Sequence, residues 1–222
     1  MNKSTCNLTL DVKIISEEAI QIKDFGMEKI FEITGEYLRT SGKTDKFIID
    51  YSDGLMITPK KDDFIRISGS LRNIMVSTEE GITYPKVYVL AKSITLLDEE
   101  PEIYLNEIKF NNVTLINTPE VRKSFTDGVT DITDIKIRVQ RNQEKFNIFK
   151  CTSWNNNARL ISNQDKGAIL DIIGRIQSKS LKNGGLRTEV SINSISIVKE
   201  VLKSNSSSEE VTNGYAEGSK EA

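Results

Sequence analysis

Histidine is absent from this chain of 222 residues, and there are only two cysteines and one tryptophan. Without histidine the protein lacks the usual general base of a serine or cysteine triad, the HExxH zinc site and most proton shuttles. The two cysteines, Cys6 and Cys151, stand far apart in unlike surroundings, which disfavours a disulfide framework or a cysteine-rich metal site. We therefore expect no metal and no cofactor.

Motifs for nucleotide binding are also missing, because neither GxxxxGK[ST] nor GxGxxG occurs. Chemistry based on carboxylates alone stays open in principle, but the acidic residues are scattered and form no DxD or ExD pair. No stretch approaches the roughly 18 apolar residues of a membrane helix, and the N-terminus has no apolar signal-peptide segment. The sequence thus predicts a cytoplasmic protein that is not an enzyme and does not contact a membrane.

Charge is unevenly distributed, although the formal net charge is only −2. Residues 1–101 carry 13 Lys and Arg against 17 Asp and Glu, whereas residues 102–203 carry 16 against 11, so the second segment is basic. The last segment, residues 204–222, is acidic and rich in Ser, Glu and Gly. It has too few apolar residues to form a core, and we expect a disordered tail.

The segment 102–203 has the pattern of a β-barrel with one helix. Runs rich in β-branched residues and bounded by turn residues predict five strands, at 107–118, 134–141, 146–154, 167–180 and 186–198. A short helix is predicted within 155–166, and Asn183-Gly184-Gly185 marks the hairpin between the last two strands. Five strands with one helix after the third are the element order of an OB-fold, a small closed barrel.

Residues 1–101 repeat this plan at low identity. Arg39 stands 102 residues before Arg141, and Gly69 stands 105 residues before Gly174. The first half has no convincing helix, because the candidate segment is short and contains Pro59. We predict an all-β protein of two tandem OB-fold five-stranded barrels, residues 1–101 and 102–203, followed by the disordered tail. The alternative is one larger barrel or sandwich of about ten strands.

Five motifs of the second half resemble, in register, those of the bacterial single-stranded DNA-binding protein family. They are TPEVRKSFTDG (118–128), IKIRVQR (135–141), IFKCTSWNNNARLI (148–161), KGAILDIIGRIQSKS (166–180) and TEVSINSISIV (188–198). The resemblance spans residues 106–198, and residues 8–98 match by fold pattern only. Ile148 stands where the family usually has an aromatic residue, with Phe146 and Phe149 on either side.

Binding of single strands without sequence preference needs flat π-faces for bases and cations for phosphates. In the third strand, alternation puts Trp154 on the same face as Lys150. In the second strand, Lys136 and Arg138 alternate with apolar residues, and none of these four outward positions holds an acid. The resemblance implies that Trp154 stacks on bases. The alternative is a tryptophan folded over the edge of the core.

Further candidate DNA-binding residues lie in the loop after the first strand, on the strands and on the last hairpin. They are Arg122, Lys123, Phe125, Arg141, Phe149, Arg175, Lys179, Lys182 and Arg187. Two alternatives stay open for them. Phe125 could pack into the end of the barrel, and a basic hairpin tip is often simply solvated.

The first barrel has a different charge pattern at the equivalent positions. Thr34 and Glu36 stand where Lys136 and Arg138 stand in the second half. A carboxylate near phosphates lowers affinity, so we expect the first barrel to support assembly or to bind a protein partner. The alternative is weak DNA binding through residues of its second hairpin, Tyr84, Lys86 and Tyr88.

The sequence therefore predicts a protein that coats single-stranded DNA during replication, recombination or repair, with little base preference. The resemblance implies assemblies of four barrels, so we expect a homodimer associated with the nucleoid, with replication or repair proteins as further partners. The alternative is an OB-fold adaptor of replication restart or recombination that binds DNA weakly.

Overall fold

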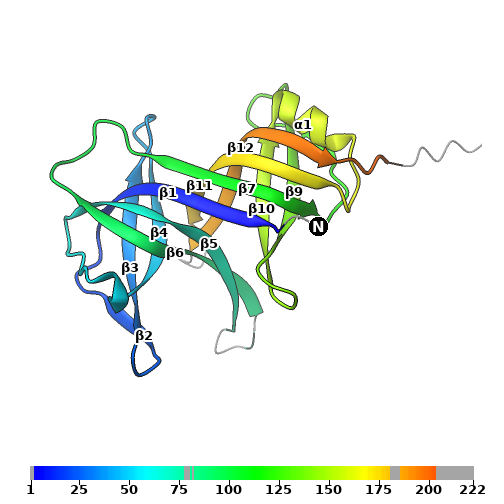
Figure 1. The fold of residues 1–222 in the computed structure, drawn as a ribbon. Helices are drawn as coiled ribbons and strands as arrows, with labels where there is room; N and C mark the ends of the chain where they lie inside the picture. The colour runs from blue at the N-terminus through cyan, green and yellow to red at the C-terminus, as the bar shows by residue number, and fades with distance from the viewer. Residues whose placement is uncertain (1–2, 78–80, 82, 181–185, 204–222) are drawn as a thin grey trace, which may run out of the picture.

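The computed structural model describes residues 3–77, 81, 83–180 and 186–203. Its strands form one continuous sheet of 12 strands that closes into two barrels (Figure 1). The predicted tail, residues 204–222, and the hairpin tip Asn183-Gly184-Gly185 lie outside the described residues. No helix in the described part of the chain is long and apolar enough to span a membrane.

The first barrel consists of six strands and one 3₁₀ turn: β1 (Thr5–Ile14), β2 (Ile20–Asp24), β3 (Lys29–Leu38), β4 (Thr44–Ser52), η1 (Asp53–Leu55), β5 (Phe64–Ser77) and β6 (Thr83–Leu97). β1, β3, β4, β6 and β5 are hydrogen-bonded in a ring, because β3 pairs with β1 and β5 pairs with β1. The β4–β6 pairing is parallel and the others are antiparallel. This is the Greek-key closure of an OB-fold.

The second barrel repeats the same ring, with a helix after its third strand. Its elements are β7 (Asn106–Leu115), β8 (Val121–Lys123), β9 (Asp131–Gln140), β10 (Phe146–Trp154), α1 (Asn155–Ser162), β11 (Ile169–Ser180) and β12 (Leu186–Lys199). β9 closes the ring on β7, and β10–β12 is the parallel pairing. The predicted fold of two tandem OB barrels is confirmed, and the alternative of one larger barrel or sandwich is wrong.

Each half has six strands rather than the five predicted. The additional strands, β2 and β8, pair with β3 and β9 at the two ends of the sheet. Every residue of both strands is exposed, and β8 has only three residues. β8 has too few residues to show an alternating apolar pattern, whereas Ile20 and Ile22 alternate with polar residues in β2 although both are exposed, so only β8 carries no strand signal in the sequence.

The two barrels are joined through their first strands. β1 and β7 pair antiparallel over six residue pairs, from Thr5 opposite Asn111 to Leu10 opposite Asn106 (Figure 1). Within this ladder Leu8 lies opposite Ile108, and both side chains are buried. Apart from Ile132 and Ala158, the buried apolar residues of both barrels belong to a single cluster. The two barrels therefore share one hydrophobic core.

A buried carboxylate holds the connection between the barrels, residues 98–105, against β1. Asp11 is fully buried, and its oxygens accept hydrogen bonds from Nε and Nη2 of Arg66 at 2.8 and 3.0 Å. The Asp11 carboxylate also accepts from the backbone N–H of Leu105 at 3.0 Å. A buried charge is tolerated only when it is paired and hydrogen-bonded. Asp11 thus ties β1 to β5 and to the connecting segment.

Two equivalent glycines allow a close approach of neighbouring strands. Gly69 in β5 and Gly174 in β11 each lie at a register shift against the next strand. A Cβ atom on Gly69 would lie 2.3 Å from the carbonyl oxygen of Leu90, and one on Gly174 would lie 2.4 Å from that of Ser191. Both oxygens belong to the backbone and cannot rotate away.

Gly174→Ala is expected to lower the free energy of unfolding by about 1–3 kcal/mol, the usual cost of forcing atoms into a packed site. Gly69→Ala should have a similar effect in the first barrel. Urea denaturation measures both changes. Ser68→Ala, at an exposed position beside Gly69, is the control and should leave the midpoint nearly unchanged. Equal midpoints for all three variants would show that the strands move apart at no cost.

Candidate nucleic-acid interface

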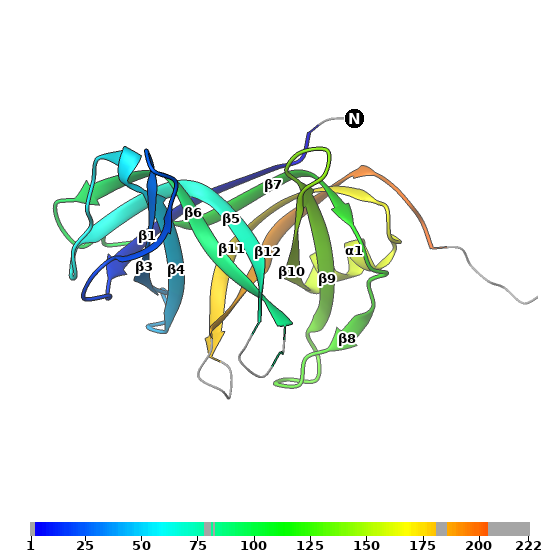
Figure 2. The same ribbon diagram turned by 90° about the horizontal axis from the view of Figure 1, so that it is seen from below.

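β9 and β10 lie side by side in the second barrel (Figure 2). The outer side of this pair consists of five rows of residues that face each other across the two strands. Along each strand, alternate residues point away from the barrel core. The rows are Gln140–Phe146, Arg138–Ile148, Lys136–Lys150, Asp134–Thr152 and Ile132–Trp154. We call these ten residues the β9–β10 surface.

The alternation predicted for these strands is present. Lys136 and Arg138 are exposed, and the apolar residues between them are buried. On β10, Lys150 is exposed and the side chain of Trp154 is 38% exposed. The indole is therefore not sealed in the core, and its ring is open to a ligand. Its predicted role in stacking stays a prediction.

Phe149 does not belong to the surface on which it was predicted to act. It is 2% exposed and packs in the core, with its ring centroid 5.7 Å from that of Phe110. Phe146 is the exposed aromatic residue instead, and the Arg138 guanidinium lies 6.0 Å from its ring centroid. The sequence indicated Phe146, because it stands an even number of residues before Trp154 on β10 and therefore lies on the same face of the strand.

Three cations of the β9–β10 surface have no counter-charge among the residues that the structure describes. Lys136 and Lys150 face each other directly across the strands, an arrangement in which like charges repel. None of the ion pairs within the described chain involves Lys136, Lys150 or Arg138. An anion bound between the two lysines would relieve their repulsion.

The β9–β10 surface also holds one acid, because Asp134 lies beside Lys136 on β9. Its carboxylate accepts from Nη2 of Arg122 at 2.9 Å and from the hydroxyl of Thr152 at 3.0 Å. Burial acts to raise the pKa of Asp134, but these hydrogen bonds hold it below its usual value. Asp134 thus forms an ion pair with Arg122. Arg122, a predicted binding residue, therefore already has an internal partner.

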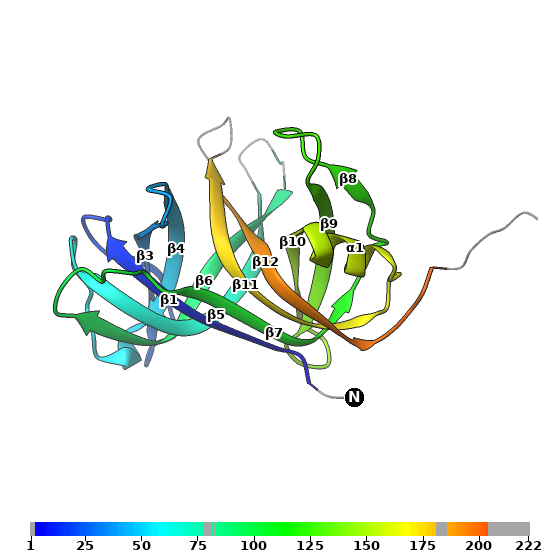
Figure 3. The same ribbon diagram turned by 90° about the horizontal axis from the view of Figure 1, so that it is seen from above.

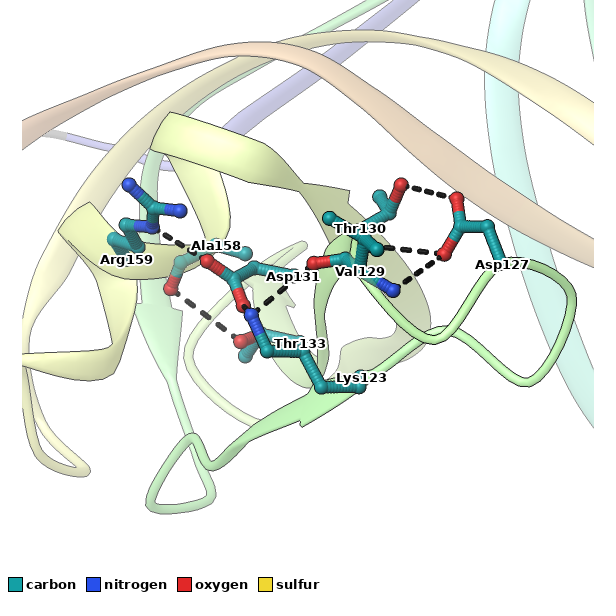
Figure 4. Close-up of polar contacts among 8 residues, drawn as sticks. All are labelled: Lys123, Asp127, Val129, Thr130, Asp131, Thr133, Ala158 and Arg159. Atoms are coloured by element: carbon teal, nitrogen blue, oxygen red, sulfur yellow. Dashed lines mark hydrogen bonds and ion pairs between the residues drawn. The ribbon is translucent and has the colours of Figure 1, made fainter.

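Lys123 also has an internal partner. Figure 4 shows Lys123 and Arg159 pointing at the same carboxylate, that of Asp131. Nζ of Lys123 lies 2.6 Å from Oδ1 of Asp131, and Nε of Arg159 donates to Oδ2. Asp131 is 5% exposed. This pairing links β8, the start of β9 and α1, so Lys123 has a structural function on the described chain.

The loop between β8 and β9 is ordered by a second carboxylate (Figure 4). Asp127 accepts from the Thr130 hydroxyl and from the backbone N–H groups of Thr130 and Val129, and these bonds lower the pKa of Asp127 to about 2. Phe125 in the same loop is 95% exposed, so it does not pack into the barrel end. Its ring lies 5.6 Å from the Arg122 guanidinium.

The predicted residues of the last hairpin fall into three groups. Lys179 and Arg187 both bond to the buried carboxylate of Glu189, each at 2.6 Å. Lys182 lies outside the described residues. Arg175 is half-buried on β11, which β12 separates from β10. Arg175 therefore does not belong to the β9–β10 surface.

The first barrel has the same rows 102 residues earlier, with opposite charge. They are Leu38–Thr44, Glu36–Lys46, Thr34–Ile48, Glu32–Asp50 and Ile30–Ser52. These rows hold three acids, one lysine and no aromatic residue. The β9–β10 surface holds three cations, one acid and two aromatic rings. The same backbone thus carries an acidic face in one barrel and a basic, aromatic face in the other.

Asp50 is a largely buried acid of the first barrel. It lies opposite Glu32, is 7% exposed, and its Oδ1 has no hydrogen-bond partner among the described residues. Lys86 bonds to Glu32, with Nζ 2.6 Å from Oε2. Burial, together with the charge of Glu32, raises the pKa of Asp50 to about 6.

The two thiols lie inside the core. Cys6 and Cys151 are both buried and unbridged. Burial raises the pKa of Cys6 to about 11 and raises that of Cys151 further, so both stay protonated at neutral pH. Among the residues that the structure describes, no group of three side chains is arranged to hold a metal ion.

No protein-family model and no curated protein matches this sequence. Among solved structures, the fold is similar to the wild-type single-stranded DNA-binding protein from Thermus aquaticus, with a TM-score of 0.70 and 17% identity over 91% of this chain and 97% of that one. A deletion mutant of the same protein has a TM-score of 0.70 and 18% identity over 92% of this chain and 100% of that one. At this identity the comparison establishes a shared two-barrel fold.

Asp50→Asn is expected to stabilise the protein at neutral pH. With a folded pKa of about 6 and an ordinary value of 3.8, ionised Asp50 destabilises the fold above about pH 6, and this cost disappears as the pH falls toward about 4. A pKa shift of about two units limits the gain in the free energy of unfolding to about 3 kcal/mol. Thermal melting of both proteins at about pH 7.5 and about pH 4 measures it. A gain of equal size at both pH values would contradict the buried-charge explanation.

Proposed function

We propose that this protein binds single-stranded DNA with little sequence preference, by base stacking and phosphate neutralisation at the β9–β10 surface. The observation that carries the proposal is the arrangement there of two exposed rings, Phe146 and Trp154, around cations without an internal counter-charge. β9 and β10 are the second and third strands of the barrel ring, the face on which OB-folds bind oligonucleotides. The fold shared with the Thermus protein, whose name describes such binding, supports the proposal.

Spacing along β10 assigns the two rings to different bases. Phe146 and Trp154 stand eight residues apart on one strand, which corresponds to about 26 Å at about 3.3 Å per residue. The Lys136–Lys150 row lies midway between them. A strand that stacks on both rings therefore passes its phosphates over the two lysines. Stacking requires only a π-face and phosphate binding only a charge, so neither selects a base.

No covalent chemistry is proposed. The setting that fits such an activity is replication, recombination or repair, where unpaired DNA is exposed, in the cytoplasm at the nucleoid. The resemblance to proteins that work with four barrels favours a homodimer, because each chain supplies two. Replication or repair proteins would be the further partners of such a complex.

An adaptor function is the second candidate, and the acidic face of the first barrel favours it. Glu32, Glu36 and Asp50 lie on that face, where they would repel phosphates and attract a basic protein segment. An adaptor of replication restart or recombination would use this face for a protein partner and bind DNA only weakly.

A salt titration of binding to oligo(dT) separates the two functions. Each neutralised phosphate contributes about −0.7 to the slope of log affinity against log salt concentration. Three free cations therefore predict a slope of about −2 or steeper for the binding protein. Absence of binding at low salt, or affinity that does not change with salt, would favour the adaptor.

Trp154→Ala and Phe146→Ala should each weaken binding to oligo(dT) by about 1–3 kcal/mol, the typical value of one base stacked on an aromatic ring. Both rings are partly exposed, Phe146 to 49% and Trp154 to 38%, so the melting temperature should fall less than after truncation of a buried ring. Fluorescence polarisation of a labelled oligonucleotide measures the affinity, and quenching of Trp154 gives an independent signal in the wild type.

Phe149→Ala is the contrasting variant, because this ring is buried. It should lower the free energy of unfolding by about 3–5 kcal/mol. If Trp154→Ala melted early and bound normally when folded, the indole would be part of the core and the proposed surface would be wrong.

A further inference from the structure

The internal repeat relates two contacts between the barrels. At the first junction, Ser178 of β11 bonds to Asp45 of β4, and at the second junction, Asn73 of β5 bonds to Asn147 of β10. Asn73 stands 105 residues before Ser178, and Asp45 stands 102 before Asn147. Figure 3 shows β5–β6 and β11–β12 lying between β3–β4 of one barrel and β9–β10 of the other.

The first junction contains its own anion. Asp45 is 1% exposed and receives two hydrogen bonds of 2.6 Å from Nε and Nη2 of Arg39. Its carboxylate also accepts from the backbone N–H of Ser178 at 2.6 Å and from the Ser178 hydroxyl at 3.2 Å. These donors of Arg39 and Ser178 therefore all have an acceptor, and the Asp45 carboxylate neutralises the charge of Arg39.

The second junction lacks that anion. Asn147 occupies the place of Asp45, and Arg141, at the same offset of 102, occupies the place of Arg39. The Asn147 side chain accepts one long bond of 3.4 Å from the backbone N–H of Asn73. Its own donor, Nδ2, is buried and has no partner among the described residues. Arg141 forms no ion pair with any residue that the structure describes.

The first barrel adds a second arginine to this junction. Arg72 precedes Asn73 on β5 and lies opposite Tyr88 on β6. Its Nε is buried and has no partner among the described residues. Burial lowers the pKa of Arg72, and the nearby charge of Arg141 lowers it further. Asn73, the next residue after Arg72, also donates from Nδ2 to the carbonyl of Ile148 on β10 at 3.0 Å. The junction thus carries one arginine from each barrel, and neither forms an ion pair with a carboxylate of the described chain.

We propose that the second junction binds one phosphate group of the single-stranded DNA through Arg72 and Arg141, and that this phosphate supplies the negative charge that the Asp45 carboxylate supplies at the first junction. The assignment rests on the proposed function. Unpartnered buried donors and adjacent like charges are both costly. A phosphate group has the charge and the acceptor oxygens to satisfy both, and guanidinium groups bind it through paired hydrogen bonds.

The position of Arg141 explains why this phosphate would belong to a bound strand. Arg141 directly follows β9, at the end of the β9–β10 surface where Phe146 lies opposite Gln140. A strand that stacks on Phe146 and continues past this end would meet Arg141 and then Arg72. The first barrel would therefore contribute to binding at its junction with the second, although its own outer face is acidic.

Asn147→Asp is the sharpest test, because it gives the second junction the carboxylate of the first. The internal carboxylate should pair with Arg141 and displace the phosphate, which should weaken binding to oligo(dT) about tenfold. The salt slope should become shallower by about 0.7. Asn111→Asp makes the same change on an exposed face of β7 and is the matched control. Equal affinities for the two variants would overturn the proposal.

Arg141→Gln gives a second test that does not alter a buried residue. It should reproduce the loss of affinity and the shallower salt slope at an unchanged melting temperature, and Arg72→Gln should weaken binding in the same direction. Arg39→Gln is the control from the first junction: it should lower the melting temperature, because Asp45 loses its partner, and leave strand affinity unchanged. Loss of strand affinity with Arg39→Gln but not with Arg141→Gln would overturn the assignment.

Inorganic phosphate distinguishes a strand from a free anion as the ligand. If phosphate raised the melting temperature of the wild type but not of Asn147→Asp, while both bound oligo(dT) equally, a free anion would be the ligand and the proposal would fail. If the wild type did not bind oligo(dT) at all, the proposed function itself would fail. If the wild type bound oligo(dT), and Trp154→Ala weakened that binding but Asn147→Asp did not, the junction assignment alone would be wrong.

Discussion

The antiparallel pairing of β1 with β7 is the interaction on which the rest of the structure depends. Each barrel closes on itself, so without this pairing the chain would be two separate rings. Six paired positions convert them into one sheet and one buried cluster. A hydrogen-bonded ladder also sets the relative register of the two rings. It therefore determines which residues of β5 lie against β10, and with them the position of Arg72 near Arg141.

The two halves show how one backbone can support two different surfaces. Cross-strand rows match at a constant offset of 102 residues. Both halves also have a glycine at a close approach within the last strand pair, Gly69 between β5 and β6 and Gly174 between β11 and β12. Outward side chains are under no packing constraint, so they can diverge without changing the fold. In the second barrel they are cationic and aromatic, and in the first they are acidic. The junctions diverge in the same way, with Asp45 in one and Asn147 in the other.

Much of the β9–β10 surface could be predicted from the sequence because alternation is a local property. It placed Lys136, Arg138 and Lys150 outward, and these positions are exposed. Applied strictly, it would also have selected Phe146 in place of Phe149, because the two lie three positions apart and an odd spacing puts them on opposite faces of the strand. Partners distant in sequence were not predictable, since Asp131 meets Lys123 and Arg159 only after the loop, strand and helix have packed together.

By itself, the sequence determined the fold class, the two-barrel repeat and the side of each strand that meets the core. These depend on apolar periodicity and turn residues, which act over a few positions of the chain. Tertiary structure alone decided which charges remain unpaired. The Glu189 carboxylate pairs with both Lys179 and Arg187, whereas Arg72 and Arg141, one from each barrel, form no ion pair among the described residues. Charge pairing depends on distances in space, and those are set by the ring closures and by the β1–β7 ladder.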